Sequence, residues 1–175
     1  MIREFEKRLL SSLVLIPIAI FFIIQGSVFF TFFLSLLFLA TSYEWIKMSK
    51  KNDFLKLLGI TFLLFSFYAT FEIREENSFK YFLFIVIICI FTDIGGYVFG
   101  KIFKGPKLTK ISPNKTYAGA IGGYFLSLIS LIVIINYIDY PYLPIQFFII
   151  FILISTVSQI GDIIVSYFKR KSKIK

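Results

Sequence analysis

Histidine is absent from this 175-residue sequence, and cysteine occurs once, as Cys89. Without histidine the chain can form neither a serine–histidine triad nor a cysteine–histidine dyad. A single cysteine also excludes an internal disulfide and a thiolate zinc site. Chemistry in this chain must therefore use carboxylates, amines, hydroxyl groups or a bound metal ion.

Acidic residues are also scarce, since the chain has 10 of them against 19 lysines and arginines. Only two acids, Asp93 and Asp162, lie inside long apolar runs. A carboxylate within a membrane segment is costly to bury, so each of these marks a candidate functional site. The alternative, which the sequence leaves open, is a structural carboxylate paired with a lysine or a hydroxyl group.

The composition indicates a membrane protein, because 58% of the residues are apolar and the mean hydropathy is +0.85. We expect an all-α, polytopic membrane helical bundle with about six transmembrane helices, forming a single membrane-embedded domain over residues 1–175. Six apolar runs of a length suited to an apolar layer of about 30 Å lie near residues 10–25, 28–46, 55–71, 79–100, 117–137 and 144–167. The first run lacks a small-residue cleavage site, which favours a retained helix over a removable signal peptide.

The basic residues predict the orientation of these helices. All but two of the 19, Arg74 and Lys80, fall near the membrane ends that share one side. By the positive-inside rule that side is cytoplasmic, so both termini of this chain are expected there.

The same assignment places both intramembrane acids at a similar depth. Asp93 lies eight residues before Lys101, and Asp162 lies seven before Lys169. At a rise of ~1.5 Å per residue, each acid is roughly 10 to 12 Å from a basic helix end. The two carboxylates are therefore expected to share one pocket that opens to the cytoplasm.

The cytoplasmic connection between the fourth and fifth runs combines helix breakers with polar donors. Ser112, Lys115 and Thr116 come directly before the fifth run. Backbone amides and the helix dipole favour anions at a helix start, so these residues predict a phosphate-binding site. For the lysines taken singly, the alternative is a role as cytoplasmic anchors only.

Small residues and a polar stripe suggest how the acids could meet. Gly96 and Gly100, like Gly119 and Gly123, have the four-residue spacing of closely packed membrane helices. On the sixth run, polar residues recur every three or four positions and form one stripe, which is expected to face protein or water: Ser155, Ser158, Gln159, Asp162 and Ser166. Close packing of the fourth, fifth and sixth runs would bring the two acids and the basic loop together.

Asp162 is the stronger of the two candidate site residues. Lys169 and Arg170 follow it by about two helical turns on nearly the same face. A carboxylate at this depth needs a metal ion or a paired cation to stay ionised. Magnesium suits such a site, because it is usually held by one or two carboxylates together with phosphate oxygens.

Three segments together resemble the phosphatidate cytidylyltransferase family in order and spacing: FTDIGGYVFG at 91–100, ISPNKTYAGAIGG at 111–123 and SQIGDIIVSYFKR at 158–170. The resemblance implies transfer of the cytidylyl group of CTP to phosphatidate, which gives CDP-diacylglycerol and diphosphate in membrane phospholipid biosynthesis. The implied partners are CTP, phosphatidate and membrane lipid, without nucleic acid, and a homodimer is left open. The family signature continues past Lys175, so we expect a C-terminally truncated member whose activity by itself is open.

The resemblance also implies roles for particular residues and a location. The implied catalytic residues are Asp162, Lys169 and Arg170, and Asp162 is also the implied magnesium ligand. Binding of a second, monovalent cation is left open. Substrate binding falls to Asp93, Tyr97, Ser112, Lys115 and Thr116. The implied location is the inner (cytoplasmic) membrane, with several passes.

Other functions stay open at this stage. Asp93 and Asp162 could bind a cation or a proton in a transporter or channel, although the sequence shows no convincing internal repeat. A related enzyme with a CTP-derived or polyprenyl substrate and an inactive truncated remnant are the remaining alternatives.

Overall fold

The computed structural model describes residues 2–49, 52–77, 79–109, 112, 115–135 and 145–172. Within these ranges every regular element is helical, and the order is α1 (Ile2–Gln25), α2 (Ser27–Met48), α3 (Asp53–Glu72), the π-helical turn η1 (Ile73–Asn77), α4 (Phe79–Phe103), α5 (Tyr117–Ile135) and α6 (Ile145–Lys171). Within the described residues, each predicted apolar run coincides with one of the six α-helices. The all-α prediction is therefore confirmed.

Four segments of the described chain are long and apolar enough to cross a membrane: Ser27–Met48, Asp53–Glu76, Phe79–Phe103 and Ile145–Lys171. Two shorter apolar segments, Leu13–Gln25 and Tyr117–Leu131, coincide with the other two predicted runs. Many large apolar side chains on these helices are exposed, as expected where lipid rather than water surrounds a helix. The chain is a multi-pass membrane protein.

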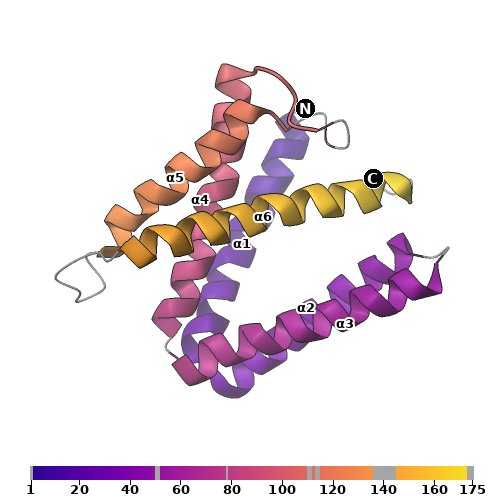
Figure 1. The fold of residues 1–175 in the computed structure, drawn as a ribbon. Coiled ribbons are helices and arrows are strands. Elements are labelled where there is room, and N and C mark those ends of the chain that lie inside the picture. The colour runs from indigo at the N-terminus through magenta and orange to yellow at the C-terminus, as the bar shows by residue number, and fades with distance from the viewer. Residues whose placement is uncertain are drawn as a thin grey trace. The chain divides into compact units, whose positions relative to one another are not determined.

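The chain divides into two compact units, Met1–Phe82 and Leu83–Lys175. The single membrane domain expected from the sequence stays a prediction. In the first unit, α2 and α3 lie side by side (Figure 1). Trp45 of α2 packs against Gly59 of α3, where a β-carbon would overlap the indole ring. Its Nε1 donates a hydrogen bond to the Leu55 carbonyl at 3.1 Å, which ties the two helices together.

A tight turn joins α1 to α2 in the same unit. Gly26 and Ser27 both have positive φ angles, 66° and 49°, a conformation in which glycine is unstrained. The Arg74 guanidinium lies against Gly26 and donates hydrogen bonds to the Ile23 carbonyl at 2.8 and 2.9 Å. Glu75 accepts a bond from the Ser27 amide at 2.8 Å. This pair of charged residues thus satisfies backbone groups at the end of α1 and the start of α2.

The second unit contains α4 from Leu83 onward, together with α5 and α6. Its apolar core is formed by Phe84, Ile88, Leu131 and Phe151. The rings of Phe84 and Phe151 pack edge to face, with their centres 5.1 Å apart. In the C-terminal half of α4 and the N-terminal half of α5, glycines replace large side chains where the two helices meet. A β-carbon on Gly119 would lie 2.7 Å from the Gly96 carbonyl oxygen, so the two backbones are in direct contact. The close helix packing predicted from the glycine spacing is confirmed at this pair.

Candidate functional site

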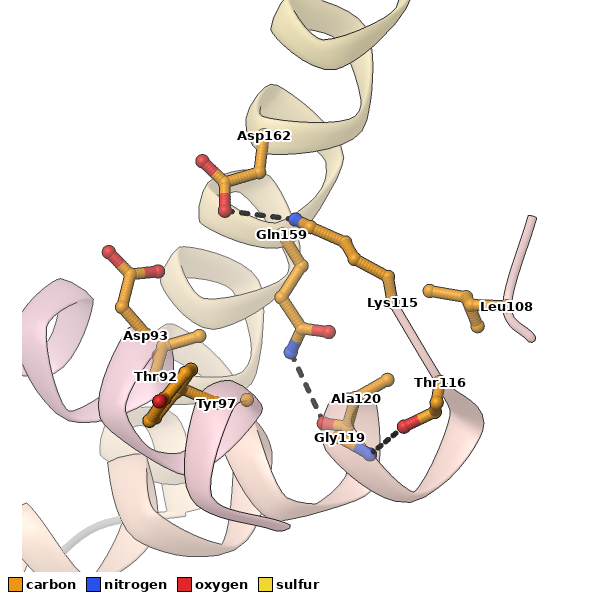
Figure 2. Close-up of a pocket in the computed structure, with 11 residues that line it drawn as sticks. Thr92, Asp93, Tyr97, Leu108, Lys115, Thr116, Gly119, Ala120, Gln159 and Asp162 are labelled. Carbon is orange, nitrogen blue, oxygen red and sulfur yellow. Dashed lines mark hydrogen bonds and ion pairs between the residues drawn. The ribbon is translucent and has the colours of Figure 1, made fainter. Parts of the chain in front are cut away.

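A cavity of about 240 Å³ lies in the second unit, lined by α4, α5, α6 and the connection that precedes α5 (Figure 2). Its volume is below the ~300 to 1,000 Å³ of sites that enclose a drug-sized ligand, so it suits part of a larger ligand, such as its phosphate groups. The lining residues are Thr92, Asp93, Gly96, Tyr97, Leu108, Lys115, Thr116, Gly119, Ala120, Gln159 and Asp162.

An ion pair crosses this pocket. Lys115 reaches from the start of α5 to Asp162 on α6, and its Nζ lies 2.9 Å from Oδ2 of the carboxylate (Figure 2). The lysine side chain is 28% exposed and the aspartate side chain is 57% exposed. Solvent and ligands can therefore reach the Asp162 carboxylate while the lysine holds it.

Asp93 brings a second carboxylate to the same pocket from α4. It interacts electrostatically with both Asp162 and Lys115. The pocket-lining residues thus carry two negative charges and one positive charge, a net charge of about −1. An excess of negative charge favours the binding of an additional cation.

The backbone around Lys115 is held by the connection that leads into α5. The Lys115 amide donates to the Ser112 carbonyl at 3.0 Å, and the Leu108 amide donates to the Lys115 carbonyl at 2.8 Å. Ser112 itself is buried, and its amide donates to the Thr109 hydroxyl at 3.1 Å. Ser112 therefore supports the Lys115 backbone rather than lining the pocket.

The start of α5 differs in part from the anion site expected there. The Thr116 hydroxyl caps the helix by accepting a hydrogen bond from the Gly119 amide at 3.1 Å. The Tyr117 amide donates to the Pro106 carbonyl at 3.1 Å. Two of the amides expected to bind an anion are thus already used by hydrogen bonds within the protein.

Polar side chains between α4 and α6 support one wall of the pocket. The Thr92 and Ser155 hydroxyls are 3.0 Å apart and fully buried. Gln159 Nε2 donates to the Ala120 carbonyl of α5 and to the Ser155 hydroxyl, both at 3.4 Å. The predicted polar stripe on α6 is therefore confirmed to face protein at Ser155 and Gln159. Thr92 was missed, because one threonine in an apolar helix gives no signal in the sequence.

Five of the eight site residues expected from the sequence line the pocket together: Asp93, Tyr97, Lys115, Thr116 and Asp162. Tyr97 lies at an exposed position, with the Lys101 ammonium 5.6 Å from its ring centre. Lys169 and Arg170 are exposed in the last turn of α6, roughly 10 to 12 Å along the helix axis from Asp162, and do not line the cavity. Their catalytic roles stay predictions.

Magnesium suits the donors present in the pocket. Asp93 and Asp162 are hard oxygen ligands of the kind that Mg²⁺ prefers, and Mg²⁺ usually takes one or two carboxylates with phosphate and water oxygens. No cluster of three or more acidic, cysteine or histidine residues occurs among the described residues, so a complete protein cage is not built from them. A metal ion bound here would need further oxygens, from a bound phosphate or from water, to complete its coordination.

Comparison with known proteins gives a family match. A model of the cytidylyltransferase family matches residues 54–175, which include every pocket-lining residue. The chain belongs to the cytidylyltransferase family. The matched residues include all of α4, α5 and α6, and almost all of α3.

Relatives of known name agree with this family. A Rickettsia typhi protein named phosphatidate cytidylyltransferase is 32% identical over 96% of this chain and 77% of its own length. Proteins of the same name from Staphylococcus saprophyticus and Staphylococcus aureus are 36% and 34% identical over 68% of this chain. The chain covers only 46% of the length of each of these staphylococcal proteins. No solved structure matches it.

Proposed function

We propose that this chain provides the active-site pocket of an enzyme that transfers the cytidylyl group of CTP to phosphatidate, yielding CDP-diacylglycerol and diphosphate. The observation that carries the proposal is the meeting of Asp93, Lys115 and Asp162 in one pocket of a membrane protein. Two carboxylates and one ammonium group suit a ligand composed of a divalent cation and phosphates. The named relatives support CTP and phosphatidate as the substrates.

The reaction requires little from the protein beyond positioning and charge neutralisation. A phosphate oxygen of phosphatidate attacks the α-phosphorus of CTP. The bond from the α-phosphorus to the oxygen that bridges it to the β-phosphorus breaks, and this oxygen leaves as part of the diphosphate. The nucleophile is already anionic, so no histidine is needed as a base, and the sequence contains none. Catalysis then depends on two things. The attacking phosphatidate oxygen must be placed in line with the oxygen that leaves, and the negative charge of the phosphates must be balanced.

Each residue has a proposed part in this chemistry. Asp162, with Asp93, would hold Mg²⁺, which would supply positive charge to neutralise the phosphates. Lys115 and the Thr116 hydroxyl bind phosphate oxygens at the start of α5. Lys169 and Arg170 neutralise the departing diphosphate from the end of α6. Tyr97 borders the pocket where the lipid substrate arrives, and Ser112 positions Lys115 through its backbone carbonyl.

The distribution of basic residues supports a location and an orientation. We place the protein in the inner (cytoplasmic) membrane, with both ends of this chain and the pocket on the cytoplasmic side, where CTP is available. The acyl chains of phosphatidate would then stay in the bilayer while its phosphate enters the pocket. A monovalent cation beside magnesium and a homodimer stay predictions.

The test is product formation from labelled CTP and phosphatidate by the full-length protein in membranes. Asp162→Asn should abolish CDP-diacylglycerol while the protein still inserts into the membrane. Asp53→Asn is the matched control, because Asp53 is an exposed carboxylate of the first unit that forms an ion pair with nearby Lys56, at 2.6 Å. Normal product formation by Asp162→Asn would refute the assignment of this pocket.

A further inference from the structure

Lys115 is the only cation among the residues that line the described pocket, and it is engaged with a proposed metal ligand. The Asp162 oxygen that accepts its hydrogen bond is a hard donor that a divalent cation would also use. A divalent cation and an ammonium group repel each other strongly at such short separations. The two cations therefore compete for Asp162.

We propose that Lys115 is an exchangeable counterion, which holds the Asp162 carboxylate while the pocket lacks ligand and moves to a ligand phosphate when Asp162 binds a divalent cation. This inference rests on the proposed function, because the exchange needs a ligand that brings metal and phosphate together. Its consequence is that metal and phosphate bind cooperatively, and that metal alone binds weakly.

The geometry allows Lys115 to move without disturbing the fold. Hydrogen bonds from the Leu108 amide and to the Ser112 carbonyl hold its backbone on both sides. Only the flexible four-carbon side chain has to change its conformation, and that side chain is 28% exposed. Asp162 is 57% exposed, so a hydrated cation can approach it from solvent.

The charges of the pocket explain why a counterion is needed when no ligand is bound. Asp93 and Asp162 both line the pocket, and two carboxylates of like charge repel each other. Lys115 offsets this repulsion through its ion pair with Asp162. Once a divalent cation takes over that task, the ammonium group is free to bind phosphate, and the two binding events favour each other to the same extent.

The first measurement is binding of Mn²⁺, as a paramagnetic probe of the magnesium site, to the purified full-length protein without nucleotide. Lys115→Met removes the competing cation and should raise the Mn²⁺ affinity, roughly five- to tenfold for an ordinary coupling between two ligands. The same variant should bind Mn²⁺ together with inorganic diphosphate more weakly than the wild type. Asp162→Asn should lose the Mn²⁺ site.

Lys107→Met is the matched control, because Lys107 belongs to the same connection, is exposed and does not line the pocket. It should leave both affinities within about twofold, as expected for a charge outside the site. An unchanged or lower Mn²⁺ affinity in Lys115→Met would refute the exchange.

A second readout uses the wild-type protein and does not depend on the folding of a variant. Acylation of individual lysines by a small amine reagent, followed by mass spectrometry, should show that Mn²⁺ increases labelling of Lys115 and that adding diphosphate reverses the increase. Lys107 labelling should stay constant. Labelling of Lys115 that does not respond to Mn²⁺ would contradict the exchange.

The inference and the proposed function can fail separately. If Lys115→Met binds Mn²⁺ more tightly but the wild type never binds or uses CTP, the exchange stands and the substrate assignment fails. If the wild type makes CDP-diacylglycerol but the Mn²⁺ affinity of Lys115→Met is unchanged, the function stands and the exchange fails.

Discussion

Gly95 of α4 lies so close to Gly122 of α5 that a methyl group at position 95 would overlap the Gly122 carbonyl oxygen. The obstacle is backbone, which cannot rotate aside as a side chain can. Gly95→Ala should therefore separate the two helices and lower the free energy of unfolding in detergent by about 1 to 3 kcal/mol, the usual cost of overpacking. Because the pocket lies at the same helix pair, activity should fall as well.

Gly161→Ala is the control for this glycine, since nothing lies within 4 Å of the position that its β-carbon would occupy. Removing a glycine from a helix interior should leave stability unchanged or raise it by about 0.5 to 1 kcal/mol. Equal stability of Gly95→Ala and Gly161→Ala would argue against the close backbone contact between α4 and α5.

Lys115→Ala should weaken the use of CTP more than it slows the chemical step. Loss of a hydrogen bond to a charged group costs about 1.5 to 3 kcal/mol, which corresponds to a rise of roughly 10- to 100-fold in KM for CTP. The measurement is kcat and KM over a range of CTP concentrations, with Lys107→Ala alongside. A CTP dependence identical to that of the wild type would remove Lys115 from the nucleotide site.

Arg74→Ala should destabilise the first unit by about 2 kcal/mol, within the range for hydrogen bonds to charged groups. Arg74 donates to the Ile23 and Ile24 carbonyls and pairs with Glu75 at 3.0 Å. Lys47→Ala is the control, because Lys47 is an exposed cation of the same unit. Protease sensitivity at the α1–α2 turn should rise in Arg74→Ala alone, and equal sensitivity in the two variants would contradict the capping role.

The Thr92 and Ser155 hydroxyls should be energetically coupled across α4 and α6. A double-mutant cycle with Thr92→Val and Ser155→Ala should give a coupling of about 0.6 kcal/mol, the average for hydrogen bonds between membrane helices. Ser127 bonds the Tyr124 carbonyl of its own helix, so pairing Thr92→Val with Ser127→Ala should give none. Equal coupling in both cycles would show that the α4–α6 hydrogen bond is not specific.

Much of the fold follows from patterns along the chain. Continuous apolar runs predict membrane helices because backbone groups in lipid must be bonded within the helix. Charged residues near their ends predict orientation in the same local way. Arg74 shows the limit of such patterns, since it is an ordinary connection residue in sequence and a cap for the end of α1 in the structure. Its partner, Ile23, lies 51 positions away.

Local sequence patterns likewise predict part of the candidate site, and tertiary packing decides the rest. The sequence by itself determined that Asp93 and Asp162 are the two acids within apolar runs, that they belong to segments resembling one enzyme family, and that glycines allow close helix packing. Only the tertiary structure decided which cation meets Asp162. The sequence favoured Lys169 and Arg170, which follow on the same helix, whereas the structure pairs it with Lys115, 47 positions earlier. The spacing along a helix determines which residues share a face, but the packing of α4, α5 and α6 determines which faces meet.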